Sequence, residues 1–267
     1  MILPHQWLRK WRLRRALRGY PLYDPPHKVE EYLLSQEKAV ENFDYFMRVR
    51  QQRTAHFQQW LRRYFRVAIT PDEKGVKALN RWGNKYAGFL LVTGPSANVR
   101  SSYFTYDPPW TGNNAGYNVL FDMGITLGDI MIAQCPKLHW VVDPVSAVLP
   151  RTAKMLKRSP GMSFQRPALT GFNDPVNSAS PLHSVWGFAH QMSRYTTTLA
   201  GLQRYLSDPR PLRRFIRDEM LNGFNAVIRG YRGREPNEFR DTMSREDYIA
   251  FVDEMESKDG EEEEKDS

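Results

Sequence analysis

The chain has 267 residues, of which 41% are hydrophobic and 13% aromatic, so it can bury a substantial core and is not globally disordered. A charged fraction of 25% and the lack of an apolar run of about 18 residues argue against a membrane-spanning helix. The single cysteine, Cys135, excludes an internal disulfide and a cysteine-based zinc site. We therefore expect a reducing compartment, with the cytoplasm as the default.

The net charge of +8 is unevenly distributed along the chain. Residues 241–267 hold twelve acidic and three basic residues, which leaves 35 basic against 18 acidic residues, or +17, in residues 1–240. Such a surface attracts nucleic acid, anionic lipid or an acidic protein, and charge alone does not choose among them. Residues 256–267 are predicted to form a disordered acidic tail, which we hypothesise covers the basic surface until a partner displaces it.

Residues 1–26 form a predicted basic arm that ends in the turn-rich stretch 19–26. Arginines interrupt its apolar residues, which excludes a secretory signal, whereas the lack of an acid before Asp24 keeps a mitochondrial transit peptide as the alternative to a cytoplasmic location. Poor amphipathicity argues against that alternative. On a helical wheel one apolar group, Trp7, Leu8 and Trp11, falls on a different side from a second group, Leu13, Leu17 and Tyr20.

The arm interleaves arginines with aromatic side chains, a combination suited to phosphate backbones and unpaired bases. The candidate nucleic-acid contacts are Trp7, Arg9, Trp11, Arg14 and Arg18. The same composition suits peripheral contact with an anionic membrane surface. The third possibility is that the arm needs no partner, because it folds onto the acidic tail or packs against the body.

Residues 27–255 are predicted to form a single domain that begins with a long amphipathic helix over residues 33–65, either continuous or broken near residues 51–54. Its apolar positions recur at three- and four-residue spacing through Val40, Phe43, Met47, Phe57, Leu61 and Tyr64. Tyr32, Phe46 and Trp60 flank this line and widen the apolar face. Packing against the body is therefore favoured over a free coiled coil.

The remaining elements follow from capping patterns and changes of period. Helices are predicted from residue 72 to about 86 and over 117–134, 181–206, 212–228 and 244–255, and strands over 88–93, 99–106 and 138–143. The fold class is therefore α+β: a helix-dominated single body, with a small sheet from 88–106 and 138–143 packed by helix 117–134 and surrounded by the N-terminal and C-terminal helices.

The segment 118–140 is the most distinctive in the chain. Gly124 and Gly128 lie one helical turn apart, so they predict a shallow groove where a strand or helix packs closely. The pattern Asp122-x-Gly124-Ile-x-x-Gly128-Asp129, with Pro136 and Trp140, resembles the core of uncharacterised bacterial accessory or immunity-like proteins, as does Gly75-Val-x-x-Leu-Asn-x-Trp82 before it. The resemblance covers residues 70–145 and implies binding more than catalysis.

No catalytic residue set, cofactor motif or metal site is predicted. His183 and His190 are seven residues apart on one predicted helix, whereas metal ligands on a helix are usually three or four apart. Asp122 and Asp129 lie two turns apart and lack partners that would complete a catalytic set. An enzyme whose site combines these two aspartates and two histidines is the third functional hypothesis.

The leading prediction is a non-enzymatic binding or accessory protein of bacterial type that recognises a protein partner through its basic surface. The predicted partner contacts are Arg12, Arg15, Trp110 and Asp129. A nucleic-acid-associated protein that uses the basic arm is the alternative. Nothing in the sequence indicates the oligomeric state.

Overall fold

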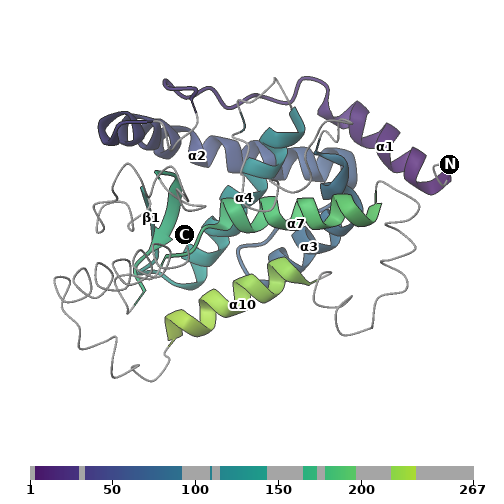
Figure 1. Ribbon diagram of the computed structural model, residues 1–267. Coiled ribbons are helices and arrows are strands. Elements are labelled where there is room, and N and C mark those ends of the chain that lie inside the picture. The colour runs from purple at the N-terminus through teal and green to yellow at the C-terminus, as the bar shows by residue number, and fades with distance from the viewer. Residues whose placement is uncertain are drawn as a thin grey trace, which may run out of the picture.

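The computed structural model of the chain describes residues 4–29, 34–91, 109, 115–142, 165–172, 178–196 and 218–232. The elements follow in the order α1 (Pro4–Leu17), α2 (Gln36–Phe65), α3 (Glu73–Tyr86), the 3-10 helix η2 (Ala87–Phe89), α4 (Ala115–Gln134), β1 (His139–Val142), β2 (Pro167–Thr170), α7 (Pro181–Thr196) and α10 (Glu219–Arg232). Figure 1 shows α4 and α7 in the middle of the molecule, with α2 on one side and α10 on the other. Helices dominate and the sheet is small, which confirms the predicted α+β class.

Helix α2 is a single continuous helix from Gln36 to Phe65. The Ser35 hydroxyl accepts a hydrogen bond from the backbone N–H of Lys38 and so caps its N-terminus. Its buried face contains Phe46, Phe57, Trp60, Leu61 and Phe65. The predicted apolar line was wrong in the first half of the helix, because Val40 and Met47 are exposed and the buried positions there lie one residue earlier.

Helix α3 begins, as predicted, at the capping residue Asp72, whose carboxylate accepts a hydrogen bond from the backbone N–H of Gly75 at 3.0 Å. The helix continues directly into the 3-10 turn at residues 87–89, so the strand predicted at 88–93 is wrong over its described part. Gly88 and Leu90 are buried there among helices. Their apolar character therefore reflects burial against the core and not sheet pairing.

Helix α4 occupies the centre of the core, with apolar and polar side chains buried on all its sides. The predicted groove at Gly124 and Gly128 is confirmed. A Cβ atom at Gly124 would lie 2.8 Å from the Cα of Leu182 on α7, and one at Gly128 would lie 2.2 Å from the ring of Trp140 on β1. Among the described helices, none is long and apolar enough to cross a membrane.

The strand predicted at 138–143 is present as β1 over His139–Val142. β1 pairs antiparallel with β2, with Trp140 opposite Leu169 and His139 opposite Thr170. β2 comes from the proline-rich stretch 144–180, where no strand was predicted. Residues 99–106, predicted to form another strand of the small sheet, lie outside the described residues.

The C-terminal helices complete the core. Helix α7 packs on α4, and α10 packs on α3, α4 and α7. The helix predicted over 212–228 extends to Arg232, while the predicted continuation of α7 beyond residue 196, the helix at 244–255 and the acidic tail lie outside the described residues.

Candidate functional site

The basic arm forms helix α1 and packs against the body. Leu13, Ala16 and Tyr20 are buried in the same core cluster as α2, α3 and α4. The indole N–H of Trp60 donates a hydrogen bond to the carbonyl oxygen of Ala16 at 2.8 Å. The rings of Tyr20 and Trp60 also meet edge to face at 5.3 Å. The part of the arm that the structure describes is therefore integrated into the fold, as the hypothesis without a partner expects.

The opposite side of α1 is open. The exposed residues on this side are Trp7, Leu8, Trp11, Arg14, Arg15 and, directly after the helix, Arg18; they are hereafter the outer face of α1. The helical-wheel prediction that the two apolar groups of the arm separate is confirmed, since Trp7 and Trp11 are 57% and 51% exposed. Arg9 is half-buried, and the guanidinium of Arg15 lies over the ring of Trp11 at 6.0 Å.

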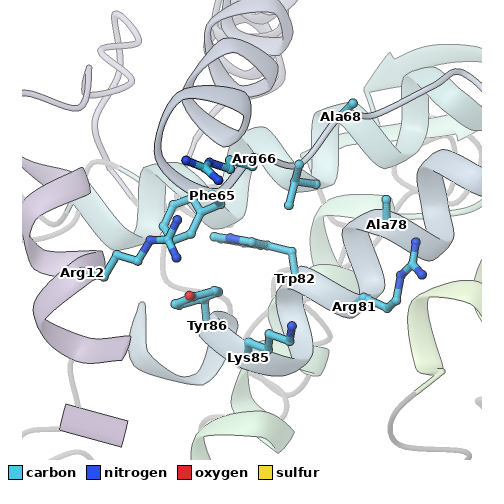
Figure 2. A pocket seen from close by; sticks show the side chains of 10 residues that line it. Arg12, Phe65, Arg66, Ala68, Ala78, Arg81, Trp82, Lys85 and Tyr86 are labelled. Atoms are coloured by element: carbon cyan, nitrogen blue, oxygen red, sulfur yellow. The ribbon is translucent and has the colours of Figure 1, made fainter. Parts of the chain in front are cut away.

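Arg12 turns away from this outer face toward α2. Its guanidinium donates hydrogen bonds from Nε and Nη2 to the carbonyl oxygen of Tyr64, with the Nε distance 2.9 Å. It also lies over the ring of Phe65 at 5.2 Å. Because these contacts fix the side chain, Arg12 forms one wall of a cavity between α1, the end of α2 and α3 (Figure 2).

This cavity, hereafter the Trp82 pocket, has a volume of about 450 Å³. Ten residues line it: Arg12, Phe65, Arg66, Val67, Ala68, Ala78, Arg81, Trp82, Lys85 and Tyr86. Figure 2 shows the cationic side chains of Arg12, Arg66, Arg81 and Lys85 around its edge and the rings of Phe65, Trp82 and Tyr86 in the middle. No lining residue is acidic. The pocket therefore combines positive charge with an aromatic floor.

Arg66 occupies an unusual backbone conformation at this site. It caps the C-terminus of α2 with φ 57° and ψ 37°, the left-handed region, and its N–H bonds back to the last turn of the helix. Glycine is the usual residue at such a position, because a Cβ atom is disfavoured there by roughly 1–2 kcal/mol. The conformation ends α2 and places the side chain of Arg66 at the pocket.

The floor of the pocket is an aromatic cluster. Trp82 stacks on Tyr86 with ring centres 5.6 Å apart and meets Phe65 edge to face at 5.4 Å. The indole N–H of Trp82 is buried and has no hydrogen-bond acceptor among the described residues. The N–H groups of Trp60 and Trp140, in contrast, donate to the Ala16 carbonyl and to the Asp129 carboxylate. Buried donors are seldom left without an acceptor, and the Trp82 donor is one of several buried polar atoms without a partner among the described residues, together with Arg50 Nε and His56 Nε2.

Asp129, a predicted partner contact, lies inside a hydrogen-bonded cluster. Its carboxylate forms an ion pair with Arg50 and accepts hydrogen bonds from Thr54 Oγ1 and Trp140 Nε1, both at 3.1 Å. These bonds join α2, α4 and β1. Both carboxylate oxygens are therefore engaged within the fold. Trp110, the aromatic residue among the predicted partner contacts, lies outside the described residues.

Asp122 belongs to a second, deeper cluster. Its fully buried carboxylate accepts hydrogen bonds from Arg53 Nε at 2.6 Å, Arg53 Nη2 at 3.0 Å and the Tyr20 hydroxyl at 2.7 Å. The Asn118 side chain bonds to the backbone N–H of Tyr23 and to the Pro109 carbonyl. We call Tyr20, Arg53, Asn118 and Asp122 the sealed cluster. It ties α1's continuation, α2 and α4 together.

Burial governs the ionisation of the sealed cluster. Desolvation raises the pKa of Asp122 to about 6, although Arg53 and the Tyr20 hydroxyl oppose this shift. Desolvation and the neighbouring Asp122 carboxylate raise the pKa of Tyr20 well above its usual value. With both carboxylate oxygens bonded and no exposed surface, Asp122 functions within the fold as a structural anion.

The two histidines of the enzyme hypothesis lie on α7. Burial, followed by the charge of Arg166, lowers the pKa of His183 to about 4. His190 packs edge to face against Trp186 at 5.2 Å. The hydrogen-bond partners of Asp122 and Asp129 come from other residues, so the described contacts do not join these carboxylates to the histidines. Within the described residues, no group of three potential ligands could hold a metal ion.

The pocket residues other than Arg12 were not predicted from the sequence. A signal existed in α3, where Arg81 and Lys85, and likewise Trp82 and Tyr86, are four residues apart and so share neighbouring helix faces. Arg66 gave no comparable signal, because only the fold brings it to α3. Arg15, predicted as a partner contact, is exposed on the outer face of α1.

Comparison with known proteins identifies no family model, no characterised protein and no solved structure that matches this chain.

Proposed function

We propose that the protein is a non-enzymatic binding protein that recognises single-stranded nucleic acid through a basic surface made of the outer face of α1 and the neighbouring Trp82 pocket. The observation that carries this proposal is the surplus of cations at the pocket. None of Arg12, Arg66, Arg81 and Lys85 forms an ion pair with another described residue. Trp7 and Trp11 on the neighbouring outer face of α1 add exposed aromatic rings, and cations beside exposed rings are the usual combination for binding single strands.

The carboxylates support a binding role over a catalytic one. Asp122 and Asp129, the acids that the enzyme hypothesis needs, already have arginine and hydroxyl or indole partners. General acid–base work requires a carboxyl group within reach of a substrate. The proposal therefore assigns these groups to the fold and the unpaired cations to binding.

The experiment is fluorescence anisotropy of a labelled oligothymidylate of about 20 nucleotides, titrated with the full chain from about 50 to about 200 mM salt. We expect binding that weakens steeply with salt, because each phosphate contact releases a counterion. Weak or salt-independent binding contradicts the proposal. Deleting the arm is an unsuitable variant, since Tyr20 bonds to Asp122 in the core.

Point variants localise the surface. The double variant Arg14→Gln and Arg18→Gln removes two exposed charges from the outer face of α1 and should weaken binding several-fold. The control is Arg48→Gln, an exposed arginine in the first half of α2. It lies 14 residues before Arg62, which is in the last turn of α2 beside the Trp82 pocket. This spacing is about 21 Å along the helix, so the variant should leave affinity unchanged.

A protein partner is the second candidate function, and the exposed apolar residues of α1 favour it. Trp7, Leu8 and Trp11 lie together on the outer face, and exposed tryptophans are typical of protein interfaces. An acidic partner protein would also satisfy the neighbouring arginines. This candidate predicts a stoichiometric partner in the native host that is lost with Trp7→Ser and Trp11→Ser but retained with the exposed-residue control Leu22→Ser.

A further inference from the structure

We propose that the Trp82 pocket binds one nucleoside phosphate unit, with the base against the aromatic floor and the phosphate among Arg66, Arg81 and Lys85. This inference rests on the proposed function and narrows it from a basic surface to a cavity with a defined ligand chemistry. The unit is either part of a single strand or a free nucleotide. Both sources present the same planar ring and the same anionic group.

The charge at the pocket calls for an anion. The acids nearest in sequence are already engaged, because Glu73 pairs with Lys77 at 2.7 Å and Asp72 caps α3. The guanidinium and ammonium groups at the edge are exposed and thus available to a ligand. Arginine and lysine bind phosphate oxygens with charge-assisted hydrogen bonds. An anionic group is therefore the complement that these side chains lack within the described fold.

The floor calls for a flat apolar group as well. Phe65, Trp82 and Tyr86 line the pocket with the edges of largely buried rings, 9%, 2% and 8% exposed, while Val67 and Ala78 add apolar walls. Inorganic phosphate would leave most of a 450 Å³ cavity unfilled, and carboxylates of an acidic peptide would leave the rings uncovered. Bases stack on or pack against aromatic side chains in a sequence-tolerant way. A nucleoside phosphate satisfies both requirements with one molecule.

Two independent features mark the pocket as built for a ligand. Arg66 holds a left-handed conformation that glycine would adopt at lower cost, and its side chain lies at the cavity. Trp82 is 2% exposed, and its indole N–H has no acceptor among the described residues. An acceptor atom on a bound base would pair with this donor once the ring shifts to expose it, because the N–H is buried in the unliganded protein. Both features become explicable once a ligand with an anionic end and a polar ring occupies the cavity.

The experiment is isothermal titration of the full chain with adenosine monophosphate, adenosine and inorganic phosphate, each alone. We expect the monophosphate to bind at least tenfold more tightly than either fragment, because only it contacts both the cations and the floor. Equal affinity for the monophosphate and inorganic phosphate would overturn the proposal. So would equal competition by polyglutamate, which assigns the cations to an acidic peptide.

The variant is Arg66→Gly, which removes the charge while keeping a residue suited to the left-handed cap. It should weaken monophosphate binding about tenfold. Arg62→Gln is the matched control, since it removes an exposed charge from the same turn of α2 outside the pocket and should change affinity less than twofold. Equal effects of the two variants would contradict a pocket site.

A parallel titration with the oligothymidylate separates this inference from the proposed function. If the oligonucleotide binds with salt dependence but Arg66→Gly has no effect, the proposed function stands and the pocket inference fails. If the monophosphate binds and the oligonucleotide does not, the pocket inference stands with a free nucleotide as its ligand and the proposed function fails. If neither ligand binds, both the proposed function and the pocket inference are overturned.

Discussion

The sealed cluster and the Trp82 pocket use the same chemistry, arginine beside aromatic rings, in opposite ways. In the sealed cluster the guanidinium of Arg53 lies over the rings of Tyr23 and Phe121 and forms an ion pair with the buried carboxylate of Asp122. In the pocket Arg12 lies over Phe65, and none of the lining residues is acidic. The difference teaches that a basic residue's partner, more than its type or its aromatic neighbours, separates a structural role from a binding role.

The largest expected effect comes from breaking the sealed cluster. Asp122→Ala leaves the buried guanidinium of Arg53 without its anion, and removal of one partner from a buried pair costs about 3–5 kcal/mol. Urea unfolding measures this loss. The double variant Arg53→Met and Asp122→Leu removes both charges and should be less destabilised than Asp122→Ala. A cost below about 1 kcal/mol for the single variant would show that the pair is not structural.

The next effect is a pH dependence of stability. Burial raises the folded-state pKa of Asp122 from 3.8 to about 6, so the folded protein binds more protons than the unfolded chain between these values. The contribution of Asp122 to stability is therefore fully present below pH 4 and lost as pH rises through 6. By linkage, the loss is about 2–3 kcal/mol.

The variant Asp122→Asn isolates this contribution, because its side chain does not titrate. The free energy of unfolding of the wild type minus that of Asp122→Asn should fall as the pH rises from 4 to 7. The pKa of His183 is lowered and the pKa of Glu219 is raised in the folded protein. Both groups are present in the wild type and in the variant, so their effects on stability cancel in this difference. If the free energy of unfolding of the wild type minus that of the variant rises with pH instead, Arg53 lowers the pKa of Asp122 more than burial raises it.

A smaller effect of opposite sign is expected at the pocket. Arg66→Gly relieves the left-handed strain at the end of α2, and it should raise the free energy of unfolding by roughly 0.5–1 kcal/mol. Thermal unfolding monitored by circular dichroism measures it. Arg66→Ala removes the same charge but keeps the Cβ atom, so it serves as the control and should not stabilise the protein. Destabilisation by Arg66→Gly would indicate that the side chain supports the fold.

The smallest effect on stability is expected for Arg81→Gln. Arg81 is exposed and forms no ion pair with a described residue, so its loss should change stability by less than about 0.5 kcal/mol. Its effect should appear in binding, where the slope of log affinity against log salt falls by about 0.7 for each lost phosphate contact on a single strand. An unchanged slope would remove Arg81 from the proposed binding surface.

Local patterns allowed much of the fold to be predicted. The capping pattern at residues 70–73 located α3, and the glycines of α4 predicted a close approach by a strand or helix, which the structure shows to be made by Trp140 and Leu182. The opposite orientation of Trp11 and Leu13 on α1 also followed from helical spacing. These features depend on residues within one or two turns of each other, which a sequence displays directly.

Features that depend on distant residues were missed. Arg53 lies on the buried face of α2 four residues before Phe57 and pairs with Asp122 on α4, a contact between distant residues that helical spacing alone does not reveal. β2 was missed because its residues pair with β1 inside a proline-rich stretch, where local signals favour irregular structure.

The pocket shows the same limit. Arg12, Arg66 and Arg81 come from three separate elements, and only their packing brings them to one cavity. The candidate site was therefore predictable as a basic surface but not as a pocket. Arg12 is the one residue that the sequence-based set and the pocket share.

The most direct test of the contrast between structural and binding arginines measures two quantities on Arg66→Gly: the unfolding midpoint and the affinity for adenosine monophosphate. The account predicts a higher midpoint together with an affinity reduced about tenfold, because the arginine is strained in the fold and engaged by the ligand. A lower midpoint with unchanged affinity would contradict it, since Arg66 would then be a structural residue like Arg53.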